Sequence, residues 1–268
     1  MNTQNLIHLI GLQRCGCHAV ANWMLHQYPT IQEPYELKEC PNEIEEQNSV
    51  SGFNHHNLFF LLYNQFWFPY QEPHAPTKVG YTPQGDVGSS VIVYETGQIN
   101  RFNLNFENKE VFGQIKNERI ILVLRDILNC CASWYKMHHE VPQHIMLFWY
   151  HRYLEITGRT NYIPNKYFVS YNEWFLNKKY REKICEDLDL TFTDVAINSV
   201  PNYGNGSSFS KREANGDAQF MGVMTRWKWL LGDKDFRKAV KPYRNLIPLS
   251  EEIFGKYDED SIIFSTSW

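Results

Sequence analysis

The fold is decided by Gly11-Leu12-Gln13-Arg14-Cys15-Gly16-Cys17-His18, a stretch that directly follows the apolar residues 6–10. Its two glycines have the spacing of a loop that holds phosphate between a strand and a helix, G-x-x-x-x-G-K-[ST]. Cys17 and His18 stand where that motif has the lysine for the outer phosphates and the hydroxyl for magnesium. Backbone N–H groups at a helix start still bind an anion, and Arg14 adds positive charge inside the loop. The stretch therefore predicts an anion site that works without magnesium.

Outward from this loop, strand-like and helix-like patterns alternate along the chain. Strands are expected over residues 5–12, 90–94, 119–125 and 166–171. Helices are expected from the loop to Pro29, from about 126, over 142–157, from about 172 and over 220–231. Because strands joined by helical crossovers form a parallel sheet, we predict an α/β fold. It would be a P-loop-type three-layer domain with a central parallel sheet flanked by helices.

The length of the chain, 268 residues, suits one large domain, and we predict a single domain over residues 1–268. Between about residues 33 and 88 the periodicity gives way to proline, asparagine, histidine and aromatic residues. A long irregular stretch in a compact domain is usually a lid or a binding segment. We therefore predict an irregular lid or acceptor-binding segment there.

Composition excludes several classes of protein. The net charge of −4 gives no overall attraction for nucleic acid, and no run approaches the roughly 20 apolar residues of a membrane span. Hydrophobic residues make up 43% and charged residues 21%, which is ordinary globular usage. The six cysteines contain no C-x-x-C pair, so neither a zinc ribbon nor a disulfide framework is indicated. A soluble, cytoplasmic protein with reduced thiols is expected.

Two further groups of residues suit an anion. Arg125 ends the clearest strand pattern, and Ser133 follows Asp126 by seven residues. Seven residues are close to two helical turns, so Ser133 can turn its hydroxyl toward a phosphate beside Arg125. Arginine suits phosphate because its planar fork gives two parallel hydrogen bonds. Later, Lys211 and Arg212 lie in a polar, glycine-rich stretch.

Together these three blocks resemble the sulfotransferases that use 3′-phosphoadenosine 5′-phosphosulfate. The first loop of that family often reads P-K-S-G-T-T or R-S-G-T; here Arg14 stands at the Lys or Arg, Gly16 matches the glycine, and Cys17 and His18 replace threonines. Residues 124–133 reproduce the spacing of its Arg-Asp-to-Ser block, with Ile127 in place of the usual proline. Residues 206–217 loosely match its R-K-G-x-x-G-D-W-K block.

The resemblance implies an enzyme that transfers a sulfuryl group from this donor to a hydroxyl or amine acceptor without a metal. In that comparison Arg14 neutralises the transferring group, and Arg125 and Ser133 hold the 3′-phosphate. The donor-binding residues that the resemblance implies are Arg14, Cys15, Gly16, Cys17, His18, Arg125, Ser133, Lys211 and Arg212.

The resemblance also implies a catalytic base. In several branches of the family a glutamate soon after the first helix takes this part, and Glu33 occupies the matching position. Glu33 would lie near the first loop if Ile31 ended a second strand beside the first. The other candidates are Glu36, Glu95, His18 and His55.

Two other functions are weighed beside the sulfotransferase. A magnesium-dependent P-loop kinase would use Asp126 as its acidic metal ligand. A nucleotide-binding module without catalysis would keep the fold but not the hydroxyls of the loop. The sequence leaves the acceptor open among carbohydrate, peptide tyrosine and small metabolite, and it defines no oligomeric state.

Overall fold

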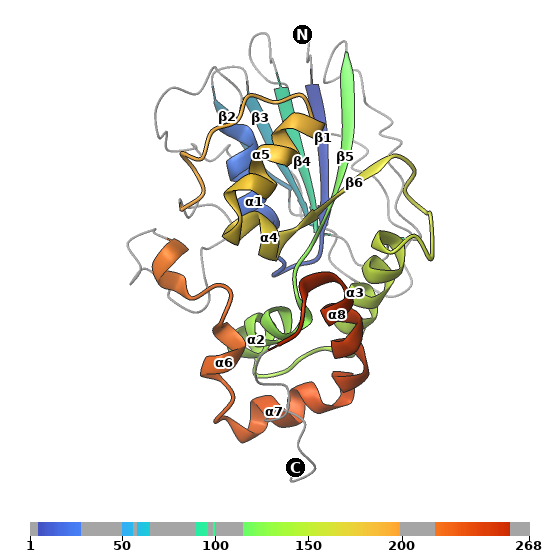
Figure 1. Ribbon diagram of the computed structural model, residues 1–268, viewed down its shortest axis with the longest axis vertical. Coiled ribbons are helices and arrows are strands. Elements are labelled where there is room, and N and C mark those ends of the chain that lie inside the picture. The colour runs from blue at the N-terminus through green and yellow to red at the C-terminus, as the bar shows by residue number, and fades with distance from the viewer. Residues whose placement is uncertain are drawn as a thin grey trace.

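A computed structural model of the chain describes residues 5–27, 50–55, 58–64, 89–95, 99, 115–198 and 218–257 (Figure 1). A six-stranded sheet stands at its centre in the order β2-β3-β4-β1-β5-β6. The strands are β1 (Asn5–Gly11), β2 (Val50–His55), β3 (Leu58–Asn64), β4 (Ser89–Glu95), β5 (Asn117–Leu124) and β6 (Lys166–Ser170). All neighbours are parallel except β2 and β3, which pair antiparallel. The predicted α/β class with a central parallel sheet is confirmed.

The strand β1 occupies the middle of the sheet, with β4 on one side and β5 on the other. Every residue of it after Asn5 is buried, the polar His8 included, as expected for a strand in the middle of a sheet. The carboxyl ends of these strands meet at one edge, where Gly11 lies in register with Glu95. The strand order reverses at β1, and ligands of open α/β sheets bind at such a switch point.

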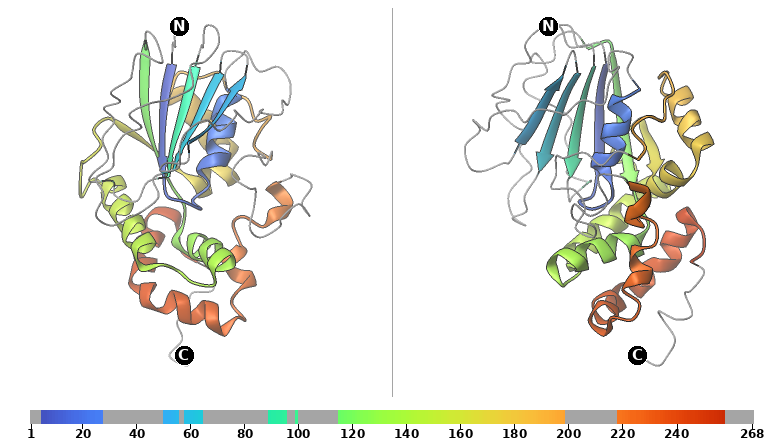
Figure 2. Two further views of the ribbon diagram at one scale, coloured as in Figure 1. Left: turned by 180° about the vertical axis from the view of Figure 1, so that it is seen from behind. Right: turned by 90° about the vertical axis from the view of Figure 1, so that its left-hand side faces the viewer.

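Helices lie on one face of the sheet and beyond its carboxyl edge. The helices α1 (Cys17–Leu25), α4 (Tyr171–Leu176) and α5 (Lys178–Asp187) lie together on one face (Figure 2). Beyond the carboxyl ends of the strands lie α2 (Ile127–His138), α3 (Gln143–Ile156), α6 (Arg226–Trp229), α7 (Lys234–Val240) and α8 (Ile247–Phe254). The 3-10 helices η3 (Ala218–Met221) and η4 (Lys241–Leu246) complete this layer.

Buried aromatic rings join α1 to α4. Trp23 and Trp174 are both buried, and their rings meet edge to face with centroids 6.0 Å apart. Such a pair adds about 0.5–1.5 kcal/mol beyond the area that it buries. The Gln27 side chain, at the end of α1, accepts a hydrogen bond from the backbone N of Thr193 at 2.8 Å. These contacts fix α1, and with it the loop before it, against the start of α4.

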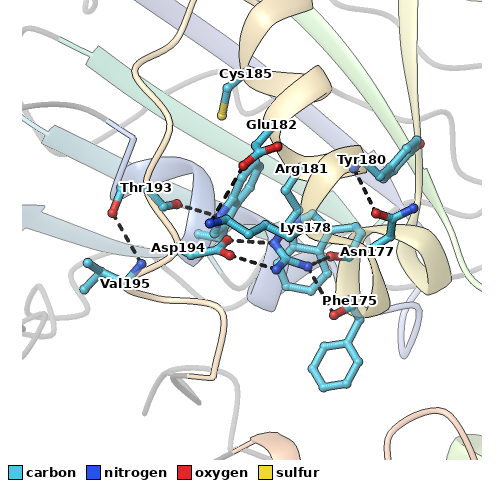
Figure 3. Close-up of polar contacts among 12 residues, drawn as sticks. Phe175, Asn177, Lys178, Tyr180, Arg181, Glu182, Cys185, Thr193, Asp194 and Val195 are labelled. Atoms are coloured by element: carbon cyan, nitrogen blue, oxygen red, sulfur yellow. Dashed lines mark hydrogen bonds and ion pairs between the residues drawn. The ribbon is translucent and has the colours of Figure 1, made fainter.

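Charged groups fix the segment after α5. The buried guanidinium of Arg181 binds both carboxylate oxygens of Asp194, at 2.7 and 2.9 Å, and donates to the carbonyl of Trp174 at 2.6 Å (Figure 3). The guanidinium loses its hydrating water on burial, and here carboxylate and carbonyl oxygens take the place of that water as hydrogen-bond acceptors. The network ties α4, α5 and residues 190–198 into one unit.

Two sequence predictions differ from the structure. Within residues 33–88, predicted as irregular, β2 and β3 form regular strands. The helix predicted over 220–231 is broken into η3, a turn and the four-residue α6. Gly222 has φ +51, outside the helical region, and the Trp229 ring lies where a Cβ on Gly222 would stand. The chain therefore turns at Gly222 and packs Trp229 over it.

Candidate anion-binding site

The loop between β1 and α1 has the backbone of an anion-binding turn. Arg14 has φ +71 and Gly16 has φ +92, so left-handed residues alternate with others before the helix. A positive φ at a residue other than glycine is uncommon and marks a strained or functional turn. No side chain caps the start of α1, and in this part of the chain the N–H groups of Gln13 and Gly16 make no hydrogen bond. These donors are suited to an anion.

The two glycines of the motif are required by close packing. A Cβ on Gly11 would lie 1.8 Å from the Cys17 sulfur, and one on Gly16 would lie 2.1 Å from the Tyr171 ring. The Cys15 sulfur accepts the backbone N–H of Leu12 at 3.2 Å. The structure buries both thiols. The backbone N–H of Cys15 donates to the carbonyl of Leu12 at 3.0 Å, so Cys15 shapes the loop from inside, and the buried Cys17 can meet a ligand only through its backbone.

Arg125 directly follows β5 and lies beside the loop. Its side chain is 2% exposed, its carbon Cζ lies 5.0 Å from the centre of the Tyr171 ring, and its Nη2 donates to the carbonyl of Val223. Among the described residues its Nε has no hydrogen-bond partner and no carboxylate pairs with it. The carbonyl of Arg125 accepts Trp149 Nε1 at 2.9 Å, which fixes the backbone. Arg125 thus directly follows the strand that the sequence predicts, and its part in binding an anion stays a prediction.

Ser133 lies between two contacts that lead to arginines. Residues four apart share a helix face, so Asn129, Ser133 and Met137 form one stripe of α2. Asn129 Oδ1 accepts the backbone N–H of Arg226 at 3.1 Å, and the Met137 sulfur accepts Arg14 Nη2 at 2.9 Å. Ser133 is buried, and no hydrogen bond joins its hydroxyl to Arg125 or to any other residue that the structure describes. Its hydroxyl keeps the capacity to bind a ligand.

Arg226, on α6, is a third arginine that sequence analysis did not single out. Its side chain is buried. Burial, with smaller effects from the charges of Arg125 and Arg14 and an opposing effect from Tyr171, lowers the pKa of Arg226 to about 9. Three arginines from β1–α1, β5–α2 and α6 thus act on one region. The signal in the sequence was an arginine three residues after Val223 on an otherwise apolar face.

A fourth arginine lies beneath the loop. Arg152, on α3, is fully buried and donates from Nη2 to the carbonyl of Gly11 at 3.0 Å and from Nη1 to that of Phe148 at 3.1 Å. Burial lowers the pKa of Arg152 to about 10, against the opposing effect of Cys15, Cys17 and Cys130. Its contact with Gly11 fixes the end of β1 from the side opposite to solvent.

Asp126, the acid of the kinase hypothesis, caps α2. Its carboxylate accepts from the backbone N of Asn129 at 2.9 Å and from the side-chain amides of Asn129 and Asn172. The side chain is fully buried. Its oxygens are thus engaged by amide donors, which disfavours Asp126 as a magnesium ligand.

The remaining predicted residues differ in what the structure says of them. Glu33, Glu36, Lys211 and Arg212 lie outside the described residues. Both sides of β1 are taken by β4 and β5, so a strand ending at Ile31 cannot pair with it, and that argument for Glu33 is lost. Glu95 lies beside Gly11 in the sheet register. His18 is the second residue of α1.

Neither a group of metal ligands nor a membrane-spanning helix occurs among the described residues. Within the described ranges, no three His, Cys, Asp or Glu side chains are grouped as metal ligands would be. No helix in the same ranges has the length and apolar character to cross a membrane. The fold and the site define an α/β protein with a candidate anion site between β1 and α1.

Comparisons with known proteins gave similarities among solved structures alone. No protein-family model and no curated protein matches the sequence. Among solved structures, the chain is similar to the sulfotransferase domain from the Synechococcus PCC 7002 olefin synthase. The two are 12% identical, with a TM-score of 0.44 over 90% of this chain and 95% of that chain. A similarity at this level assigns no activity to this chain.

Proposed function

We propose that the protein binds 3′-phosphoadenosine 5′-phosphosulfate and transfers its sulfuryl group to a hydroxyl or amine acceptor. The observation that carries the proposal is that Arg14, Arg125 and Arg226 lie close enough to interact. They do so at the strand–loop–helix turn that holds the N–H donors of Gln13 and Gly16. The loop has neither the lysine nor the hydroxyl of a magnesium-dependent loop. A donor with two anionic ends and no need of a metal suits this arrangement.

The proposed roles follow from position. Arg14 and the loop N–H groups bind the 5′-phosphosulfate, with Gly16, Cys17 and His18 acting through their backbone. Cys15, whose N–H donates to the carbonyl of Leu12, holds the loop in shape. Arg125 and Ser133 bind the 3′-phosphate. Lys211 and Arg212 cover the bound donor. Arg226 adds charge between the two ends, because its guanidinium interacts with those of both Arg125 and Arg14.

In the proposed reaction the acceptor oxygen or nitrogen forms a bond to sulfur, and the bond from sulfur to the 5′-phosphate oxygen breaks. Adenosine 3′,5′-bisphosphate leaves, and a base takes the acceptor proton. Catalysis needs alignment of the two reactants and positive charge on the leaving oxygen, as in phosphoryl transfer. Glu33 stays a candidate base, and Glu95 is favoured by its register with Gly11.

A calorimetric titration with adenosine 3′,5′-bisphosphate in EDTA, beside ATP with magnesium, tests the donor class. We expect the bisphosphate to bind and ATP to bind at least tenfold more weakly. The reverse preference would favour a magnesium-dependent kinase. Transfer of label from ³⁵S-labelled donor to a panel of carbohydrate, tyrosine-peptide and small-molecule acceptors then tests catalysis, since binding without transfer would indicate a nucleotide-binding module.

A further inference from the structure

Two thiols meet inside the candidate anion loop. The sulfur atoms of Cys15 and Cys17 are 3.2 Å apart, and both side chains are buried. A disulfide bond measures about 2.05 Å, so the two atoms must approach by little more than an ångström. Gly16, the one residue between them, has φ +92. This glycine allows the backbone to turn sharply enough to bring both side chains to the same side.

The contact between the two sulfur atoms favours reaction within this pair. The buried guanidinium of Arg152 interacts with Cys15 and Cys17, and with Cys130 as well, and a nearby cation stabilises the thiolate, which is the reactive form. Burial raises the pKa of Cys130 well above its usual value and that of Cys185 to about 12, which disfavours the thiolate at each. Arg14 and Gly16 are half-buried at the surface, so local opening of the loop exposes the pair to a small oxidant.

The reduced thiols also hold the loop in shape. Cys15 accepts the N–H of Leu12 at 3.2 Å, and the Cys17 sulfur fills the space above Gly11 that a Cβ would occupy. Cys17 is the first residue of α1, where the backbone donors of the candidate site lie. Moving the two sulfurs together must therefore move the start of α1 relative to Leu12.

We propose that Cys15 and Cys17 form a reversible dithiol–disulfide pair, oxidised by a hydroperoxide, that controls the anion loop. One thiolate attacks the peroxide oxygen and breaks the O–O bond, which gives a sulfenic acid and, from hydrogen peroxide, water after protonation. The second thiol attacks the sulfenic sulfur, forms the S–S bond and releases a second water. A small dithiol reverses the reaction by exchange and is itself oxidised to a disulfide. The effect on the donor rests on the proposed function; the formation of the disulfide does not.

The test uses the full chain, treated with equimolar hydrogen peroxide. The protein is then denatured in the presence of N-ethylmaleimide, which blocks the thiols that are still free. The six cysteines give six blocked thiols when reduced, and we expect four after oxidation. Peptide mapping should find Cys15 and Cys17 in one disulfide-containing peptide, and dithiothreitol should restore both thiols. Cys17→Ser and Cys17→Ala remove the pair and should keep the remaining five thiols under the same treatment. Cys185→Ser is the matched control, because this buried thiol donates to Gln27 Oε1 away from the loop.

Titration of both redox forms with adenosine 3′,5′-bisphosphate completes the test. A tenfold or greater loss of affinity on oxidation, reversed by dithiothreitol, would support the proposal. Six blocked thiols after peroxide, or a disulfide joining Cys15 to Cys130, would overturn it. A disulfide with equal affinity in both forms would overturn the control of the loop. A disulfide in a protein that binds the bisphosphate in neither form would support the pair and count against the proposed donor.

Discussion

At the scale of single residues, Arg125 is the most direct test of the proposed donor site. Its guanidinium is buried between Tyr171 and the carbonyl of Val223 and has hydrogen-bonding capacity left at Nε. We expect Arg125→Ala to weaken binding of adenosine 3′,5′-bisphosphate by about 1.5–3 kcal/mol, the range for a hydrogen bond to a charged group. Isothermal titration measures this change.

Two further variants separate charge from shape at this position. Arg125→Lys keeps the positive charge but loses the planar fork, so we expect an intermediate affinity. Arg244→Ala removes an arginine on the exposed side of η4 and should bind as the unaltered protein does. Equal affinities of Arg125→Ala and Arg244→Ala would remove Arg125 from the site.

The lowered pKa of Arg226 predicts a pH dependence of anion binding. Burial and the neighbouring cations bring this pKa to about 9, so the guanidinium is charged at pH 7 and loses its proton as the pH rises through 9. A bound anion raises this pKa, and binding above pH 9 then takes up a proton. Affinity should therefore fall with rising pH, by up to about tenfold per pH unit.

Titrations with the bisphosphate between pH 7.5 and 10 measure this dependence. Arg226→Gln carries no charge at any pH, so it should bind more weakly at pH 7.5 and show a shallower decline. If the variant and the unaltered protein declined in parallel, another group would be responsible for the pH dependence.

The site residues were predictable where a local motif carried them. Arg14 and Arg125 follow from strand ends, because a buried strand pattern fixes where the chain leaves the sheet. Arg226 and Arg152 were missed, since each lies on a helix whose place against the loop depends on packing between distant segments. The burial of Cys15 and Cys17 was missed as well, because spacing alone does not tell which side of a loop a thiol takes.

At the scale of elements, the β1–α1 turn depends on Gly16 for two separate reasons. The residue has φ +92, and a Cβ there would lie 2.1 Å from the Tyr171 ring. Gly16→Ala should therefore destabilise the protein in two ways, through backbone strain of about 1–3 kcal/mol and through displacement of a buried ring. We expect a loss of unfolding free energy in urea together with weaker binding of the bisphosphate.

Gly158→Ala separates the two effects in the same urea measurement. Gly158 has φ +73 with nothing within 4 Å of an added Cβ, so its substitution brings strain alone. Gly232 also has open space at that position, and no positive φ is recorded there; Gly232→Ala should be close to neutral. Equal losses at Gly16 and Gly158 would mean that the Tyr171 ring moves aside without cost.

The order of elements was largely predictable, and their edges less so. The strands β1, β4, β5 and β6 were each predicted within two residues because β-branched and leucine runs identify buried strands. The strands β2 and β3 were missed in a stretch rich in asparagine and aromatic residues. The helix predicted over 220–231 failed because an apolar period does not reveal that Gly222 adopts a positive φ.

At the scale of the whole molecule, the candidate site joins the sheet to the helices beyond its edge. Its residues come from the β1–α1 loop, the end of β5, α2 and α6. A ligand held by all of them should stabilise both layers at once. At one hundred times its Kd the bisphosphate should raise the unfolding free energy by about 2.7 kcal/mol, measured by urea unfolding.

Hydrogen exchange gives the distribution of this effect. Protection should rise in residues 11–20 and 221–230 together, since both contact the proposed ligand. For Arg125→Ala the stabilisation should fall to about 0.3–1.3 kcal/mol at the original ligand concentration and return to its full size when the concentration is scaled to the weaker Kd. Protection confined to one of the two segments would mean that the ligand contacts only one layer.

The central position of β1 also has a consequence for how the chain is made. Asn5 pairs with Ser89 on one side and with Asn117 on the other, so β1 leaves the ribosome well before both of the strands that it pairs with. Parallel pairing over such sequence separations slows folding, and an apolar strand left waiting is open to aggregation. Nascent chains that end before residue 117 should therefore depend on chaperones that shield apolar segments until β5 has emerged.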